Sequence, residues 1–302
     1  MSILVVGSVF FDSIETPHGK VDRALGGAAT YFSVAASFFA PVKMVATVGE
    51  DFPQEEVEFL SKRGIDLSGL QRRAGRTGFW AGRYHEDMNQ RDTLDLQLNV
   101  FADFQPQLPP SHRDAQYVFL ANIDPKLQAM VLDQLAAPGL VGCDTMNHWI
   151  SSARGELEQL LRRVGILVIN DEEARQLSGE HNVVKAARRL LAMGPKRVLI
   201  KRGEYGVIQF SANSVFAVPA FPLEEVFDPT GAGDTFAGGF MGELARSGDT
   251  SEAGLRRAIV YGSVLASFVV EDFGMARLRT LTHEAIEHRY RQFVSLTDID
   301  GA

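Results

Sequence analysis

The chain is poor in cysteine and in basic charge, and it has no long apolar run. Its single cysteine, Cys143, lies in the apolar stretch LVGCD, so a disulfide scaffold is excluded and a buried thiol is expected. Lysine and arginine number 30 against 38 acidic residues, without a basic cluster, which argues against nucleic acid as a partner. The N-terminal run MSILVVGSVFF lacks a basic segment and soon meets Asp12, so it predicts neither a signal peptide nor a membrane span. We therefore expect a cytoplasmic protein with small-molecule partners.

Several catalytic motifs are also absent. No G-x-x-x-x-G-K-[ST] sequence occurs, which excludes a Walker A loop. A dinucleotide-binding G-x-G-x-x-G starting at residue 231 would need glycine at 236, where the chain has Phe236. The segments VLIK (198–201) and DFG (272–274) look like protein-kinase motifs, but no H-R-D loop or leading glycine-rich loop accompanies them. The seven histidines show no ligand spacing, so we assign none to a metal.

Composition and periodicity predict one large α/β unit. With 302 residues, of which 45% are apolar and 23% charged, the chain can bury a large core. Short apolar runs alternate with helical patterns, which predicts a mostly parallel sheet with helices on both faces. The expected strands are 3–6, 43–47, 117–120, 140–143, 166–169 and 197–201, with a late hairpin of 206–210 and 215–218; the expected helices are 28–39, 125–136, 154–163, 183–192, 234–247, 252–270 and 283–293.

The most informative stretch is 226–240, VFDPTGAGDTFAGGF. The backbone N–H groups of Gly231, Ala232 and Gly233 can turn toward one point, and a helix that begins near Asp234 adds the positive end of its dipole. An anion would bind there, and Asp234 could accept a proton from a hydroxyl that attacks it. This pattern indicates a kinase of small alcohols. Taken alone, the same residues also suit a simple turn in which Asp234 caps the helix.

Two segments carry a resemblance to a known family. DPTGAGDTFAGGF resembles the C-terminal signature of the ribokinase family of small-molecule kinases, also called the phosphofructokinase B family. Residues 26–49, GGAATYFSVAASFFAPVKMVATVG, are similar to its first signature, a Gly-Gly pair that opens an apolar helix before a strand ending in glycine. The two segments lie in the expected order near opposite ends of the chain. The resemblance implies a single ribokinase-like α/β domain over residues 1–302.

The resemblance implies which residues bind the acceptor. Asp12 matches the family aspartate that accepts hydrogen bonds from substrate hydroxyls, although it also suits a turn or cap. Gly26 and Gly27 match the pair that lets substrate approach the backbone. Where the family usually has an asparagine that contacts the sugar, this chain has Tyr31, which can donate one hydrogen bond or stack. Asn122 follows the strand 117–120 and is expected at the edge of the sheet where ligands bind.

The resemblance also implies a nucleotide and magnesium side. Asn170 and Glu173, in NDEEARQL, look like the family's N-x-x-E element, which orders Mg²⁺ and its waters near the ATP phosphates. On local sequence the same two residues equally suit a helix cap. Lys201 and Gly203 occupy the segment that touches ATP phosphates or ribose in relatives, but Lys201 also suits a solvated strand end. We therefore expect ATP as co-substrate and Mg²⁺ as cofactor.

Two further elements belong to the implied phosphate-transfer region. Asp228 and Thr230 correspond to positions that bind a monovalent cation, usually K⁺, in some relatives. The segment 144–149, DTMNHW, resembles a family element near the same region, and its Trp149 is expected in the core. A K⁺ requirement is thus a prediction that rests on the resemblance alone.

Two insertions interrupt the α/β alternation, at residues 13–25 and 75–101. Both have an extended, strand-like pattern, and in the ribokinase family such insertions pair into a small β lid over the substrate. The first insertion is short, so the lid covers less of a substrate or relies on a second subunit. A homodimer that forms through the lid is therefore among the expectations.

The resulting prediction is an ATP-dependent kinase that transfers the γ-phosphoryl group to a primary hydroxyl of a small sugar, with Asp234 as base and residues 231–233 as anion hole. A nucleoside kinase of the same fold is the alternative, because the aromatic residues of the acceptor side can stack on bases. These residues are Phe10, Phe11, Tyr31, Phe79, Trp80 and Tyr84. A catalytically silent protein that binds sugar or nucleotide as a sensor is a third reading, to which the change at Tyr31 gives room.

Overall fold

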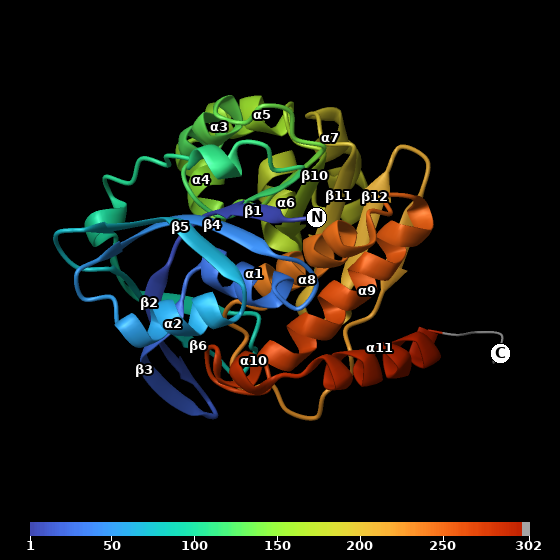
Figure 1. Cartoon of the computed structure of the whole chain (residues 1–302). Helices are drawn as coiled ribbons and strands as arrows, with labels where there is room; N and C mark the ends of the chain where they lie inside the picture. Colours follow the sequence, from blue (N-terminus) through green and yellow to red (C-terminus); the bar gives the residue numbers. More distant parts are fainter. Residues whose placement is uncertain (298–302) are drawn as a thin grey trace.

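The computed structural model describes residues 1–297, and its centre is a nine-stranded sheet (Figure 1). Seven adjacent strands run parallel, and two antiparallel strands complete one edge. In spatial order the strands are β13 (Val215–Val218), β12 (Val207–Ser211), β11 (Arg197–Lys201), β10 (Ile166–Asn170), β9 (Leu140–Cys143), β8 (Tyr117–Leu120), β1 (Ile3–Val6), β4 (Val42–Gly49) and β5 (Ile65–Arg73).

Helices cover both faces of this sheet, each over its own apolar core (Figure 1). The central strands are fully buried apolar runs, as expected for a parallel sheet covered on both sides. Within residues 1–297, every helix is too short or too polar to cross a lipid bilayer. One face carries α1 (Ala28–Ala36), α2 (Gln54–Lys62), α8 (Ala232–Ser247), α9 (Glu252–Val269), α10 (Ala276–Thr280) and α11 (His283–Thr297), and the other carries α3 (Pro125–Asp133), α4 (Asn147–Ser152), α5 (Arg154–Leu161), α6 (Asp171–Ser178) and α7 (Val183–Ala192).

The two inserted segments pair into one small, separate sheet, the lid. Its strand order is β3 (Gly19–Gly26), β2 (Phe10–Thr16), β6 (Gly78–Tyr84) and β7 (Arg91–Gln97). β2 and β6 run parallel, and the two outer pairs are antiparallel hairpins. Figure 1 shows β2, β3 and β6 below the end of the main sheet that holds β4 and β5. The expected small β lid is therefore present, and its strands begin three residues earlier than the first predicted insertion.

The predicted elements of the main sheet are confirmed, with shifts at some ends. The first helix ends at Ala36 rather than at residue 39, because the chain tightens there into turns in which the amides of Phe38 and Phe39 donate to carbonyls three residues back. The sequence analysis did not predict α2 or β5. β5 is an edge strand with many polar residues and α2 buries only Leu60, so neither carries a strong apolar pattern.

Close packing of α1 on α8 fixes where α8 begins. A β-carbon at Gly238 of α8 would overlap the carbonyl oxygen of Phe32 in α1, so only glycine allows this approach. On its other side α8 packs against α9, where Gly239 faces Gly262. Because both neighbours hold α8 closely, the N-terminus of α8 stays at the carboxyl edge of the sheet.

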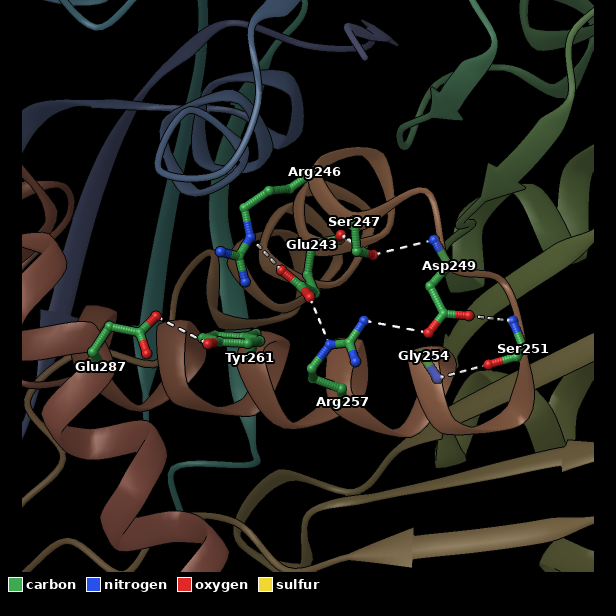
Figure 2. Close-up of polar contacts among 9 residues, drawn as sticks. All are labelled: Glu243, Arg246, Ser247, Asp249, Ser251, Gly254, Arg257, Tyr261 and Glu287. Carbon is green, nitrogen blue, oxygen red and sulfur yellow. Dashed lines mark hydrogen bonds and ion pairs between the residues drawn. The ribbon is translucent and has the colours of Figure 1, made fainter.

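A buried carboxylate ties the other end of α8 to α9 (Figure 2). Glu243 is 1% exposed and lies between two guanidinium groups, with Oε2 2.7 Å from Arg246 Nε and Oε1 2.8 Å from Arg257 Nε. Arg257 also reaches Asp249 in the turn between the helices, and Ser251 caps α9 by accepting from the amide of Gly254. The carboxylate is buried while Arg246 and Arg257 are 47% and 36% exposed, so loss of both guanidinium groups would leave a buried charge unpaired. The network therefore holds the ends of the two helices together.

Candidate active site

The GAG turn, residues 231–233, opens α8 at the carboxyl edge of the sheet. Gly231 is the N-cap residue with φ of 75°, a left-handed conformation that glycine adopts without strain. Among the described residues 1–297, no side chain caps the first turn of α8. The Ala232 amide donates to the carbonyl oxygen of Pro229 at 3.2 Å, so an anion at this helix terminus would have to share or displace that bond. Asp234 lies in this first turn. The structure therefore brings together the predicted anion site and the predicted base.

Side chains hold the GAG turn from two directions. The ring of Tyr31 lies directly against Gly231, so that a β-carbon at 231 would overlap it. The ammonium group of Lys201, at the end of β11, lies against Gly233 in the same way. Lys201 thus places a positive charge beside the turn, where an anion would need it.

Tyr31 supports the turn from the core. Its side chain is 1% exposed and its hydroxyl has no hydrogen-bond partner. Burial raises the pKa of Tyr31, and the charges of Asp12 and Asp228 raise it further. Tyr31 therefore lies between the acceptor side and the GAG turn. Its direct contact with an acceptor stays a prediction.

Asp234 belongs to a coupled pair of carboxyl groups with Asp144, which follows β9. Burial raises the pKa of Asp144 well above its ordinary range, and the charge of Asp234 raises it further. The pKa of Asp234 is also raised by burial, but Lys201, the Asp144 carboxyl and Arg91 oppose this rise. Asp144 therefore keeps the proton while Asp234 is the group that ionises first.

Asp12 reaches the same region from the lid strand β2. It is 5% exposed, and a β-carbon at Gly26 would overlap its carboxyl group, which explains the first glycine of the Gly-Gly pair. The second, Gly27, has φ of 92° and begins α1. Burial, followed by the charge of Asp228, raises the pKa of Asp12 to about 7. Without a ligand, this carboxyl group holds its proton to near neutral pH.

Asn170 and Glu173 form a reciprocal helix cap. The Glu173 amide donates to Asn170 Oδ1 at 2.7 Å, and the Asn170 amide donates to Glu173 Oε2 at 3.0 Å. Burial raises the pKa of Glu173, while Lys201 and Arg91 oppose the shift. The capping reading is therefore realised. The cap uses Glu173 Oε2 and not Oε1, so it does not exclude the predicted magnesium role.

Asp228 ties the loop before the GAG turn to a distant turn. Its Oδ1 accepts from the Thr230 amide and its Oδ2 from the Gly274 amide, both at 2.8 Å. Burial raises the pKa of Asp228, and these amides oppose the rise. Both oxygens thus already accept one hydrogen bond each. The monovalent-cation role of Asp228 and Thr230 stays a prediction.

Asn122 lies at the same sheet edge, after β8. Its Oδ1 accepts from Trp149 Nε1 at 3.0 Å, and its amide nitrogen lies 3.2 Å from Met146 Sδ. Asn122 is half-buried, as is Trp149. The amide group therefore has local partners already, and its contact with substrate stays a prediction.

The aromatic residues of the acceptor side separate into core and site. Phe10 packs against Phe101 and Phe11 against Phe52, with ring centroids 5.1 and 5.8 Å apart. Trp80 of β6 is half-buried and pairs directly with Asp12 across the β2–β6 ladder, so both side chains share one face of the lid. Of the rings compared, Trp80 is the one that lies beside Asp12 and keeps exposed surface that a ligand could contact.

The tip of the lid hairpin reaches the nucleotide segment. Gly203 follows β11 with φ of 54°, and a β-carbon there would overlap Asn89 Oδ1 in the turn between β6 and β7. The lid therefore touches the segment that the sequence analysis assigned to ATP.

Comparison with known proteins agrees with this arrangement. A family model described as pfkB family carbohydrate kinase matches residues 2–280. The chain belongs to the pfkB family. Among its relatives, a cytidine kinase from Thermococcus kodakarensis is 33% identical over 267 residues, which cover 85% of this chain and 95% of the relative.

Solved structures share the pfkB-family fold over nearly the whole chain. A nucleoside kinase from Burkholderia thailandensis, solved with inosine, has a TM-score of 0.79 at 19% identity and covers 96% of this chain and 97% of its own. A protein from E. coli described as a candidate ribokinase II, solved with ATP and Mg²⁺, has a TM-score of 0.78 at 21% identity, with coverage of 96% and 99%. At these identities the likeness establishes the fold.

The sequence analysis missed one cation of this pfkB-family site, Arg91. It begins β7, pairs with Tyr84 across the hairpin, and lies with its guanidinium carbon 5.8 Å from the centre of the Trp80 ring. Arg91 keeps exposed surface on β7, yet the surrounding protein desolvates its guanidinium group and lowers its pKa, while Tyr84, Glu173 and Asp234 raise the pKa overall. Its charge therefore acts on residues of both the main sheet and the lid. Only the register of the β6–β7 hairpin reveals this, because the local sequence NQRDT carries no motif.

The raised pKa of Asp12 predicts a pH-dependent cost to folding. The carboxyl titrates near 3.8 when unperturbed and near 7 in the folded protein, so the folded state holds this proton more tightly. The contribution of Asp12 to the free energy of unfolding therefore falls as the pH rises from about 4 to about 7. Asp12→Asn removes this titration, and its melting temperature should rise relative to the parent protein across that interval. The free-energy difference is bounded by about 4 kcal/mol.

Asp51→Asn provides a control of opposite sign. Burial acts to raise the pKa of Asp51, but hydrogen bonds from Thr77 and Arg23 lower it overall. A lowered pKa stabilises the fold at neutral pH, and this contribution is lost as the pH falls. Asp51→Asn should therefore be destabilised most, relative to the parent protein, near neutral pH. Thermal unfolding of the ligand-free proteins across the acid-to-neutral range measures both trends. A pH-independent difference between Asp12→Asn and its parent would contradict the assigned titration.

Proposed function

We propose that this pfkB-family kinase transfers the γ-phosphoryl group of ATP to a hydroxyl of a nucleoside. The carrying observation is that Asp234 directly follows the GAG turn, and that the positive charges of Lys201 and of the lid residue Arg91 act on it. In the reaction the acceptor oxygen bonds to the γ-phosphorus, the bond to the bridging oxygen breaks, and ADP leaves. The hydroxyl proton passes to Asp234.

The charges around Asp234 support its role as base. The pKa of Asp144 is raised well above its ordinary range, whereas Lys201, the Asp144 carboxyl and Arg91 oppose the rise at Asp234, which favours Asp234 as the member of the pair that carries the charge. Lys201 and Arg91 offset charge on the transferring group, and the amides of Gly231, Ala232 and Gly233 hold its oxygens. Because the transition state of phosphoryl transfer is loose, positioning and charge stabilisation dominate over complete deprotonation.

Two observations favour a nucleoside over the sugar that the sequence analysis placed first. The chain is 33% identical to a cytidine kinase over most of both chains, whereas sugar kinases are the wider family description. Trp80 shares a lid face with Asp12, which suits a ring that stacks on a base while the carboxylate accepts from ribose hydroxyls. Gly26, Gly27 and Asn122 complete the acceptor side of this proposal, with Tyr31 behind it.

The nucleotide side consists of Asn170, Lys201 and Gly203 together with the GAG turn. Within residues 1–297, no cluster of three or more acidic, histidine or cysteine side chains is arranged to hold a metal alone. This fits Mg²⁺, which keeps several waters and binds mainly through nucleotide phosphates. Asn170 and Glu173 would hold these waters, and the ion supplies positive charge to the phosphates. Asp228 and Thr230 are the proposed residues for K⁺.

Replacement of the base tests the reaction and its acceptor. Asp234→Asn should keep the fold and ATP affinity but lower kcat by roughly 100-fold or more, because a positioned proton acceptor is lost. ATP consumption is measured with cytidine, inosine and ribose, and the parent protein should prefer a nucleoside. The control is Asp103→Asn, because Asp103 is an exposed carboxylate that is remote from Asp234 in the sequence. Near-parent kcat in Asp234→Asn would remove it as base, and a parent protein that transfers phosphoryl to none of the acceptors would favour the binding-only reading.

Glu173→Gln tests the magnesium side. Loss of one negative charge near the hydrated ion should raise the Mg²⁺ concentration that gives half the maximal rate. The control is Glu172→Gln, since Glu172 is the exposed neighbour in the same helical turn. Initial rates across a Mg²⁺ titration measure the effect. Equal Mg²⁺ dependence in Glu173→Gln and the parent would restrict Asn170 and Glu173 to helix capping.

A homodimer through the lid is the proposed assembly. β7 is the free edge of the lid sheet, all its residues are exposed, and Leu94, Leu96 and Leu98 are exposed by 52%, 53% and 43%. An edge strand with exposed apolar side chains can pair with a second copy. Leu94→Lys should reduce the mass in light scattering from twice 33.2 kDa to 33.2 kDa. Val215→Lys, 61% exposed on the edge strand β13, is the control, and a parent protein of 33.2 kDa would refute the dimer.

A further inference from the structure

One hydrogen bond joins the lid hairpin to the loop before the anion site. The hydroxyl of Thr230 donates to the hydroxyl of Tyr84 at 3.1 Å. Tyr84 ends β6 and is 5% exposed, and Thr230 directly precedes Gly231. Within residues 1–297, no other hydrogen bond connects residues 78–97 with residues 228–234. The contact therefore links two parts of the site that belong to different sheets.

Thr230 connects the lid contact to the GAG turn, because it is the residue before Gly231. Its amide donates to Asp228, which in turn accepts from Gly274, so residues 228–230 have a defined backbone path. On the opposite side the ring of Tyr31 lies against Gly231. The turn is thus bounded by an aromatic ring from the core and, through Thr230, by a hydroxyl from the lid. The core contact lies within the main domain, whereas the Tyr84 contact joins the turn to the lid.

We propose that Tyr84 is a positioning residue that couples lid closure over the acceptor to the geometry of the anion turn. The proposal rests on the kinase function above and deepens it. When an acceptor beside Asp12 and Trp80 favours the closed lid, the Tyr84–Thr230 bond forms and places the GAG amides for transfer. Without an acceptor the bond is less populated, which disfavours transfer of the phosphoryl group to water.

A double-mutant cycle tests the coupling. Tyr84→Phe removes the acceptor hydroxyl of the bond while keeping the ring, and kcat should fall roughly 3- to 10-fold, as expected for one neutral hydrogen bond, with the KM for ATP unchanged. In a Thr230→Val background the same change should have a smaller effect, because the bond to Thr230 is already absent and only the interaction of the Tyr84 hydroxyl with Arg91 remains to be lost. In a Thr230→Ser background, which retains a hydroxyl, it should lower kcat again.

Tyr117→Phe is the matched control. It also removes a tyrosine hydroxyl, but Tyr117 begins β8 and so lies at the amino edge of the sheet, away from the site. Hydrogen exchange gives a second readout that does not need activity: Tyr84→Phe should speed exchange of the amides at 230–233, and Tyr117→Phe should not. Equal losses of kcat from Tyr84→Phe in the parent and Thr230→Val backgrounds, or unchanged exchange at 230–233, would overturn the proposal. A parent protein that phosphorylates no acceptor would instead refute the kinase function, while the exchange experiment would still decide whether Tyr84 orders the turn.

Discussion

The site depends on the balance between five convergent carboxyl groups and two cations. The pKa values of Asp12, Asp144, Glu173, Asp228 and Asp234 are all raised, with burial as the first cause in each. The positive charges of Lys201 and Arg91 offset part of the negative charge of these carboxylates. Hydrogen bonds from backbone amides offset a further part. So much buried acid is costly unless cations or substrate hydroxyls complete it. The same imbalance favours protonated carboxyl groups and would favour a bound cation.

The remaining architecture serves to hold this balance in position. Glycines let backbone and charged groups approach where a β-carbon would not fit: Gly26 beside Asp12, Gly231 on Tyr31 and Gly233 on Lys201. The close packing of α1, α8 and α9, with the buried Glu243 network at the far end, keeps the first turn of α8 at the sheet edge. Rigid helices thus place the base and the anion turn, while the lid supplies Asp12, Trp80 and Arg91.

The lid contacts the main domain at the predicted nucleotide segment and beside the predicted anion turn. The lid touches the nucleotide segment at Gly203 and the loop before the anion turn at Thr230. A ligand that shifts the lid therefore acts on both sides of the transferring phosphoryl group. Such coupling requires that the lid contacts be few and weak enough to open, as single hydroxyl bonds are.

The sequence by itself determined the strands of the main sheet, the motif at 231–234 and the two lid insertions, because these depend on local periodicity and on adjacent residues. It left Asn170 and Glu173 open between a cap and a metal role, since both use the same atoms. Only the tertiary structure decided that Tyr31 lies against Gly231, that Asp144 and Asp234 affect each other's pKa, and that Tyr84 bonds to Thr230 before the anion turn. It also brought Arg91 close enough to Asp234 for their charges to interact. These pairs are far apart in the chain, and Arg91 is placed by a hairpin register with a bulge between Ala81 and Gly82. A one-residue change in such a register moves a side chain to the opposite face of the sheet, which local sequence does not specify.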